Sequence, residues 1–429
     1  MPDLMTKNEL RYERCVSVRY IKKNMFVSRL DRPWIETPFW VQGFVIRTDQ
    51  EVEALKKYCN SVYIDITRGD EAKFYIEHDY SLTRSTNKGA FKVRAKHSTP
   101  YQNEISYKEE LDEAKKALEV ATEKFFLVMD NVHHGKSLGL KYVPQVVNPL
   151  IDSVIRNPDA LLLLIHLRDK NDLINYHSID ACVMTISFAR YLGKSQEQIF
   201  RLAVGSLLMD LGKLNIPEKV LNKTEPLTEA EVSEVRSHVD DSINFLKDHE
   251  DFHSDVINMI RSHHERSNGS GYPQGLTESS IPENAKIAGI IDCYNAMCNE
   301  RPHNNLYIPS DSIRNLDMMK ESHFNPSLVD EFMYCMGQFP NGSLVELRNG
   351  KVGVVLSQHH LKYDKPEIML LLDENKKAYK DFKVIDLSSQ KFNNKSHSIE
   401  RGLHQEAYGI NLPVIYDKLN LAIHKEMLN

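Results

Sequence analysis

The chain has 429 residues, of which 41% are hydrophobic and 27% charged, as in an ordinary globular protein with roughly two or three domains. Its 60 acidic residues nearly cancel its 54 basic ones, and the net charge of -6 argues against a nucleic-acid polymer as a partner. No apolar run approaches the ~20 residues of a membrane helix, and the amino terminus lacks the pattern of a secretory signal. The six cysteines are scattered without a CxxC pair, so we expect reduced thiols and a cytoplasmic protein.

Residues 1–75 are predicted to form a small α+β or β domain. Three strands and one short helix are expected in it, at residues 16–20, 25–27, 62–65 and 51–58. Both tryptophans, Trp34 and Trp40, lie in this region, and we interpret them as core residues.

Residues 76–104 are predicted to be a basic linker. No acidic residue occurs from Ser81 to Asn103, whereas five basic residues, Arg84, Lys88, Lys92, Arg94 and Lys96, accumulate there. Such a segment is poor in core-forming residues and is typical of a flexible linker. Contact with a phosphate-rich ligand is the alternative interpretation.

Residues 105–338 are predicted to be nearly all α-helical. Helical periodicity is seen at residues 106–125, 142–166, 176–192 and 199–208, and a further helix begins at Thr228. Thr228 and Glu231 have the spacing of a capping box, in which each side chain bonds the other residue's backbone. This region would form the main helical domain.

After Pro340 the pattern changes to that of a small β-rich appendage, at residues 339–390. Four strands are expected, at residues 343–347, 352–356, 368–372 and 384–387, and Asn349-Gly350 is a strong hairpin signal between the first two. Residues 391–429 are assigned to a C-terminal tail.

Histidines and aspartates in the helical region are candidate metal ligands. They are His177, Asp210, His238, His263, His264 and Asp292. Neutral imidazoles and carboxylates suit Fe, Mn and Zn, and a bridging carboxylate permits two ions ~3.5–4 Å apart. A lone helical histidine such as His238 is more often a surface or core residue. An acid such as Asp292 within an apolar helix, however, usually has a partner.

The order of these six residues resembles that of the HD-GYP family. The resemblance covers residues 146–338 and includes the accompanying motifs Gly212-Lys213, Ile216-Pro217, Pro226-Leu227-Thr228, Gly271–Leu276 and Arg301-Pro302. The pattern LDRPW…TPF…QGF…VYID near the amino terminus also resembles a domain of unknown function that often precedes HD-GYP modules. The resemblance implies a mainly α HD-superfamily bundle that hydrolyses the bacterial second messenger cyclic di-GMP.

The resemblance also implies roles for individual residues. Asp210 would bridge two metals, the first held with His177, Asp292 and a histidine expected at position 209. The second metal would be held with His238, His263 and His264. Lys213, one helical turn from Asp210, would neutralise a substrate phosphate. The substrate and partner loop would comprise Gly271, Tyr272, Pro273 and Arg301.

The sequence departs from the family pattern at position 209, where Met209 replaces a ligand. A neutral thioether suits soft metals, so the first site is reduced to His177, Asp210 and Asp292. We therefore expect one or two divalent ions per chain, with Fe or Mn favoured. Leu173 stands where some family members have a glutamate that binds a third metal, so a third ion is not expected. Ser267, Asn268, Asn295 and His303 are further departures around the site and point to weakened support of the centre.

Three functions are compatible with these residues. The first is a cyclic di-GMP phosphodiesterase, releasing pGpG or GMP, whose activity is weakened by the lost ligand. The second is an inactive pseudoenzyme that binds cyclic di-GMP or a partner such as a GGDEF-domain protein. The third is a hydrolase of another nucleotide, since a fold alone does not determine the substrate. Whether the chain is an active enzyme is left open between the first two.

Overall fold

The computed structural model of the chain forms two compact units, Met1–Arg94 and Ala95–Asn429. The structure describes residues 13–19, 21–31, 44–65, 101–134, 140–168, 173–221, 223, 227–247, 252–298, 308–359, 362–392, 394–405, 407–412 and 414–415. Among them, no helix is long and apolar enough to cross a membrane.

The first unit contains a small antiparallel sheet and one helix, as predicted. Its elements are β1 (Glu13–Ser17), β2 (Phe26–Leu30), β3 (Phe44–Val45), α1 (Asp49–Tyr58) and β4 (Ser61–Asp65), with strand order β1-β4-β2-β3. Thr48 and Glu51 form a capping box that starts α1. Leu55 of α1 is fully buried with Val27 and Val62 of the sheet. Trp34, Trp40 and most of the predicted basic linker lie outside the described residues.

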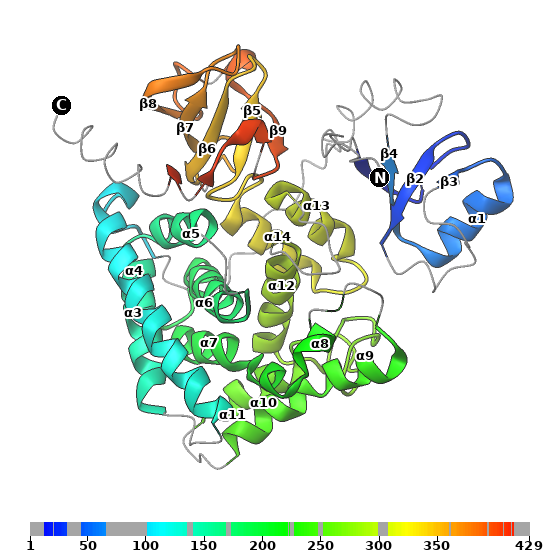
Figure 1. The fold of residues 1–429 in the computed structure, drawn as a ribbon, viewed down its shortest axis with the longest axis vertical. Helices are drawn as coiled ribbons and strands as arrows, with labels where there is room; N and C mark the ends of the chain where they lie inside the picture. The colour runs from blue at the N-terminus through cyan, green and yellow to red at the C-terminus, as the bar shows by residue number, and fades with distance from the viewer. Residues whose placement is uncertain are drawn as a thin grey trace, which may run out of the picture. The chain divides into compact units, whose positions relative to one another are not determined.

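The second unit is mainly helical (Figure 1). Its helices are α3 (Tyr107–His133), α4 (Val143–Arg156), α5 (Pro158–Leu167), α6 (Leu173–Tyr191), α7 (Gln196–Leu208), α8 (Glu218–Leu221), α9 (Glu229–Arg236), α10 (His238–Leu246), α11 (Ser254–Ser262), α12 (Glu283–Cys298), α13 (Pro309–Met319) and α14 (Pro326–Met336). Helix α6 packs against α4, α7 and α12, so its described side chains are mostly buried. The predicted capping box of Thr228 and Glu231 starts α9.

One prediction in this region was wrong, because residues 142–166 do not form a single helix. The chain breaks at Asn157, whose extended backbone ends α4 and whose side chain accepts a hydrogen bond from the Asp159 amide at 2.9 Å. Pro158 then occupies the first turn of α5, where its missing N–H costs nothing.

The chain ends in a five-stranded antiparallel sheet of order β8-β7-β6-β5-β9. Its strands are β5 (Leu344–Leu347), β6 (Val352–Ser357), β7 (Glu367–Leu372), β8 (Ala378–Asp386) and β9 (Ile399–Leu403). Gly350 has a φ of 82°, as the predicted turn between β5 and β6 requires. Strand β9 pairs with β5, so the sheet extends into the segment that was assigned to a C-terminal tail.

A buried polar network joins this sheet to the helices. The Asn341 amide nitrogen donates to the Asp159 carboxylate at 2.9 Å, and the Gln358 amide nitrogen donates to the Asn341 side-chain oxygen at 2.8 Å. These bonds connect α5 to the segments flanking β5 and β6. The helices and the sheet therefore share one packed body, and the six candidate ligands lie in its helical part.

Candidate metal centre

All six predicted ligands meet where α6, α7, α10, α11 and α12 come together. They are His177 on α6, Asp210 just after α7, His238 at the start of α10, His263 and His264 just after α11, and Asp292 on α12. Two groups of ligand atoms within 4.8 Å of one another result, one from Asp210, His238, His263 and His264 and the other from His177, Asp210 and Asp292. Asp210 belongs to both groups.

A tight turn after α7 places Asp210. Ser242 of α10 accepts a hydrogen bond from the Gly212 amide at 2.8 Å and donates one to the Met209 carbonyl at 2.8 Å. A Cβ atom on Gly212 would lie 2.0 Å from the His238 carbonyl oxygen, so only glycine lets α10 approach this closely. Met209 itself is buried and belongs to the apolar core.

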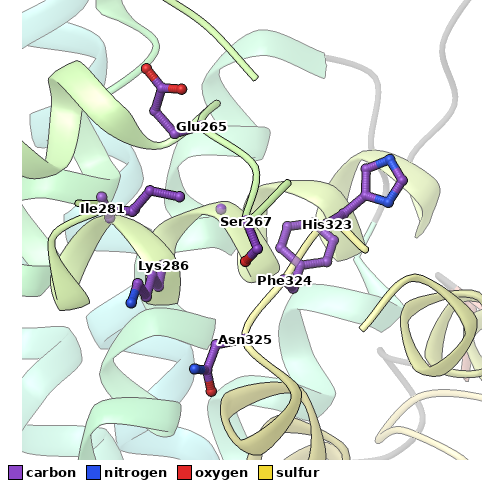
Figure 2. A pocket seen from close by; sticks show the side chains of 9 residues that line it. Glu265, Ser267, Ile281, Lys286, His323, Phe324 and Asn325 are labelled. Carbon is purple, nitrogen blue, oxygen red and sulfur yellow. The ribbon is translucent and has the colours of Figure 1, made fainter. Parts of the chain in front are cut away.

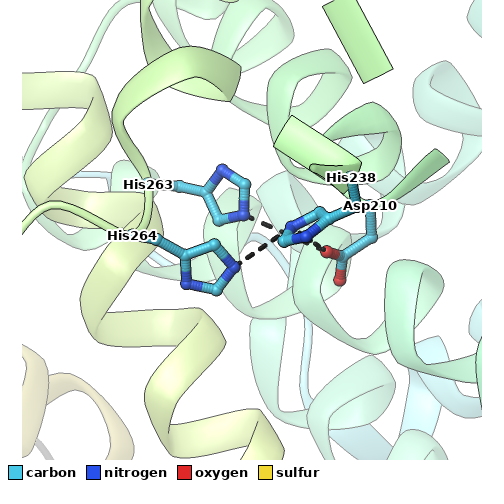
Figure 3. A group of neighbouring side chains, drawn as sticks. All are labelled: Asp210, His238, His263 and His264. Carbon is cyan, nitrogen blue, oxygen red and sulfur yellow. Dashed lines mark hydrogen bonds and ion pairs between the residues drawn. The ribbon is translucent and has the colours of Figure 1, made fainter. Parts of the chain in front are cut away.

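The first group forms a three-histidine half of the centre (Figure 3). His238 Nε2 lies 3.4 Å from Asp210 Oδ1, and His263 Nε2 lies 4.0 Å from the same oxygen. His264 Nε2 lies 3.2 Å from His238 Nε2. The three imidazoles and one carboxylate oxygen therefore converge on a single point.

The second group is organised around the other oxygen of Asp210. His177 Nε2 lies 3.5 Å from Asp210 Oδ2 and 3.4 Å from Asp292 Oδ1. Lys213 Nζ forms an ion pair with Asp210 Oδ2 at 2.8 Å. His264 Nδ1 lies 3.6 Å from Asp292 Oδ2 and so connects the two groups.

Backbone carbonyls orient two of the imidazoles. His238 Nδ1 lies 2.6 Å from the Val235 carbonyl oxygen, and His263 Nδ1 lies 2.7 Å from that of Ile260. Because a carbonyl only accepts, each Nδ1 carries the proton and donates. Each Nε2 then presents its lone pair toward Asp210, which is the tautomer that a metal ligand needs.

The protonation states of the cluster also suit metal binding. Burial lowers the pKa of His263 to about 4, and burial likewise lowers the pKa values of His238 and His264. Burial by itself would raise the pKa of Asp210, but Lys213 and the neighbouring histidines outweigh it and hold that pKa below its ordinary value. At neutral pH the imidazoles are therefore uncharged and the carboxylate is ionised, as ligation requires.

Three buried polar atoms support the fit to a cation. Both Asp210 carboxylate oxygens and His263 Nε2 have no hydrogen-bond partner among the described residues. Such orphaned atoms are rare in folded proteins and call for an explanation. A divalent ion bound by nitrogen and oxygen ligands would satisfy Asp210 Oδ1 and His263 Nε2, so the residues fit the metal that the sequence predicted.

The loop with the Gly-Tyr-Pro sequence lies beside the three-histidine half. The Tyr272 ring stacks on the His264 ring at a centroid distance of 4.6 Å and an angle of 22°. Gly269 has a φ of 79°, and a Cβ on Gly271 would lie 2.5 Å from the Glu265 Cα atom. Both glycines are therefore required by the path of the loop. Arg301, the remaining predicted residue of this group, lies outside the described residues.

Two residues near the loop were not predicted as part of the site. The buried Glu265 carboxylate accepts hydrogen bonds from the amides of Gln274 and Leu276, at 2.7 and 2.8 Å, and clamps the loop. The exposed Arg236 lies over the Tyr272 ring, 4.9 Å from its centroid. The sequence offered one signal for both residues, since each carries a charge within two positions of a candidate histidine ligand.

A small pocket lies at the base of the loop (Figure 2). Its lining includes Ser267, Lys286, Phe324 and Asn325 and none of the six predicted ligands. Beside it, the Glu278 carboxylate accepts hydrogen bonds from the side chains of Ser267, Lys286 and Asn325. The pocket is thus a feature of the loop's support, distinct from the cluster.

Comparisons with known proteins agree with this architecture. The HD domain family matches residues 166–328, a domain of unknown function (DUF3391) matches residues 15–142, and a KOW domain associated with HD domains matches residues 344–407. The chain is therefore an HD-domain protein with a domain on either side.

Several proteins similar to this chain are named as cyclic dinucleotide phosphodiesterases. The chain is 27% identical to the cyclic di-GMP phosphodiesterase PA4108 of Pseudomonas aeruginosa, over 87% of this chain and 88% of that protein. It is 32% identical to the cyclic di-GMP phosphodiesterase response regulator RpfG of Xanthomonas campestris, over 34% of this chain and 39% of that protein. It is 31% identical to the 3'3'-cGAMP-specific phosphodiesterase 1 of Vibrio cholerae, over 34% of this chain and 33% of that protein. The chain belongs to the HD-GYP family.

The clamp at Glu265 predicts a loss of stability when it is removed. In Glu265→Ala two backbone amides of the loop lose a charged acceptor, so we expect the free energy of unfolding to fall by about 1.5–3 kcal/mol. Denaturant titration would measure this. Glu283→Ala, which removes an acid that is 61% exposed, should cost less than about 1 kcal/mol. Equal losses in the two variants would contradict the clamp.

The low pKa of His263 predicts that stability depends on pH. Its pKa falls from 6.5 to about 4 on folding, so the unfolded chain takes up a proton first as the pH drops. The contribution of His263 to the free energy of unfolding is therefore complete above pH 6.5 and is lost progressively as the pH falls toward 4. We expect the Tm of the metal-free protein to fall between pH 7 and 5, and to fall less steeply in His263→Asn. If the Tm fell equally steeply with pH in the wild type and in His263→Asn, His263 would not be the source of the pH dependence. The exposed His133→Gln serves as the control.

Proposed function

We propose that the protein is a metal-dependent phosphodiesterase that hydrolyses cyclic di-GMP to pGpG or GMP in bacterial signalling, at a rate lowered by the methionine at position 209. The observation that carries this proposal is the convergence of Asp210, His238, His263 and His264 within 4.8 Å, with buried atoms that lack partners among the described residues. Relatives named as cyclic di-GMP phosphodiesterases support the substrate, one of them over 87% of this chain.

The chain's own groups suit a phosphodiester substrate. A bound divalent ion would neutralise phosphate charge and make water more acidic. Lys213, whose side chain is 18% exposed, is a cation in contact with Asp210 that can attract a phosphate. Arg236 and the Tyr272 ring beside His264 add a cation and an aromatic surface, which suit phosphate and base respectively.

The metal is proposed to be Fe or Mn. Imidazole nitrogens and carboxylate oxygens are ligands that these ions accept, whereas thiolates, the ligands of softer sites, do not occur in either ligand group among the described residues. Elemental analysis of the purified protein would identify the ion.

Hydrolysis of cyclic di-GMP by the full chain, supplied with Mn or Fe, tests the function. We expect pGpG or GMP to be released with at least one of these metals and detected by chromatography. Product no higher than that of an Asp210→Asn variant, with every metal, would overturn the proposal. The cyclic dinucleotide 3'3'-cGAMP, the substrate named for one relative, would be assayed in parallel, and faster turnover of it would correct the substrate.

A pseudoenzyme that binds without hydrolysis is the second candidate, favoured by Met209. This methionine belongs to the apolar core and offers no hard ligand. Calorimetric binding of cyclic di-GMP without any product would support it, and measurable turnover by the wild type would end it. Binding to a GGDEF-domain protein and a cytoplasmic location stay predictions.

A further inference from the structure

The two oxygens of Asp210 have different surroundings. Neither oxygen has a hydrogen-bond partner among the described residues, but Oδ1 faces the imidazoles of His238 and His263. Oδ2 already has the Lys213 ammonium 2.8 Å away. A second dication at Oδ2 would therefore have a like charge beside it, whereas an ion at Oδ1 would not.

Asn295 holds the imidazole of His177. It lies one turn after Asp292 on α12 and is 1% exposed. Its side-chain nitrogen donates to the His177 carbonyl at 2.9 Å and lies 3.0 Å from His177 Nδ1. The backbone carbonyl oxygen of His177 can only accept, so the Asn295 side-chain atom that faces it must be the amide nitrogen. His177 Nδ1 must then accept, so its proton resides on Nε2.

This tautomer makes His177 a hydrogen-bond donor toward the carboxylates. Its Nε2 faces Asp292 Oδ1 at 3.4 Å and Asp210 Oδ2 at 3.5 Å. Ligation through Nε2 would need the proton on Nδ1, where it would oppose the Asn295 donor at 3.0 Å. An acid at position 295 would instead accept from Nδ1 and favour the ligating tautomer.

We propose that this chain binds a single divalent ion, in the three-histidine half, and that Asn295 together with Lys213 keeps the half formed by His177 and Asp292 closed to a second ion. This inference rests on the metal centre of the proposed function and assigns Asn295 as a positioning residue. Restoring a histidine at position 209 would then not be sufficient to bind a second ion.

Metal content tests the inference directly. The full chain would be saturated with Mn or Zn, desalted, and analysed for metal per chain. We expect one equivalent in the wild type and in Met209→His. We expect two in Met209→His combined with Asn295→Asp, because the added carboxylate both accepts from His177 Nδ1 and offsets the Lys213 charge. The matched control combines Met209→His with Asn258→Asp, which adds the same charge at an exposed site on α11 and should stay at one.

Each outcome of this experiment is decisive. Two equivalents in the wild type would overturn the inference and leave the proposed function intact. None with either ion would overturn both. One equivalent in the folded Met209→His, Asn295→Asp variant would show that Asn295 does not close the half formed by His177 and Asp292.

A second measurement observes the imidazoles of the wild-type protein directly. In nitrogen-15 spectra of the histidine rings at neutral pH, metal-free His177 should carry its proton on Nε2. Adding Zn should shift the Nε2 signals of His238, His263 and His264 and leave His177 Nε2 protonated. A proton on His177 Nδ1, or loss of its Nε2 proton with Zn, would overturn the inference. His177→Gln would assign the signal.

Discussion

Asp210→Asn is expected to remove the bound metal and to lower the hydrolysis of cyclic di-GMP by roughly 10²–10³-fold or more, the scale of losing one electrostatic group at a reacting centre. The carboxylate is shared by both ligand groups, and its Oδ1 atom is the oxygen on which the histidines converge. A neutral amide of the same shape removes that charge with little change in packing. Metal analysis and product chromatography would measure the two effects.

Asp255→Asn is the matched control for this variant. It makes the same chemical change at a side chain that is 44% exposed and paired with Arg201 on the neighbouring helix α7. Its stability should change by less than about 1 kcal/mol, and its metal content should not change. If Asp210→Asn retained one equivalent of metal and full activity, Asp210 would not be a ligand.

Gly212→Ala is expected to destabilise the protein by about 1–3 kcal/mol or more and to release the metal. The added Cβ would lie 2.0 Å from the His238 carbonyl oxygen and 2.7 Å from the Ser242 amide nitrogen, both backbone atoms of α10. Relief therefore requires α10 to move, and His238 moves with it. Denaturant titration and metal analysis would detect the two effects together.

Asn215→Ala provides the comparison for Gly212→Ala. Asn215 is exposed at the end of the same turn, so its truncation alters the turn's surface without pressing on α10. We expect wild-type metal content and a small change in the free energy of unfolding. A stable, metal-loaded Gly212→Ala protein would show that α10 does not need to approach this closely.

The predicted features that were confirmed depend on short-range physics. The capping box of Thr228 and Glu231 and the turn at Asn349-Gly350 involve residues close together in the chain, so local residue types determine them. The break at Asn157 was missed, although Pro158 was a visible signal for a helix start.

The membership of the metal cluster could be predicted because its residues occur in a specific order that resembles a known family. Composition and periodicity alone would not have joined His177 to Asp292, which lie 115 positions apart. The strand β9 was missed for a related reason. Its pairing with β5 across more than fifty residues leaves no local pattern that differs from an irregular segment.

The sequence by itself determined the fold class, the family and the six candidate ligands, because periodicity, turn chemistry and motif spacing are properties of the chain order. The tertiary structure alone decided which Asp210 oxygen faces the histidines, and that the Asn295 amide meets His177 Nδ1 at 3.0 Å. The first contact depends on the packing of α10 against the turn after α7, and the second on the packing of α12 against α6, so both bring together atoms far apart in the chain. The direction of the hydrogen bond between Asn295 and His177 Nδ1 decides whether His177 Nε2 can bind a metal or instead donates a hydrogen bond to the carboxylates.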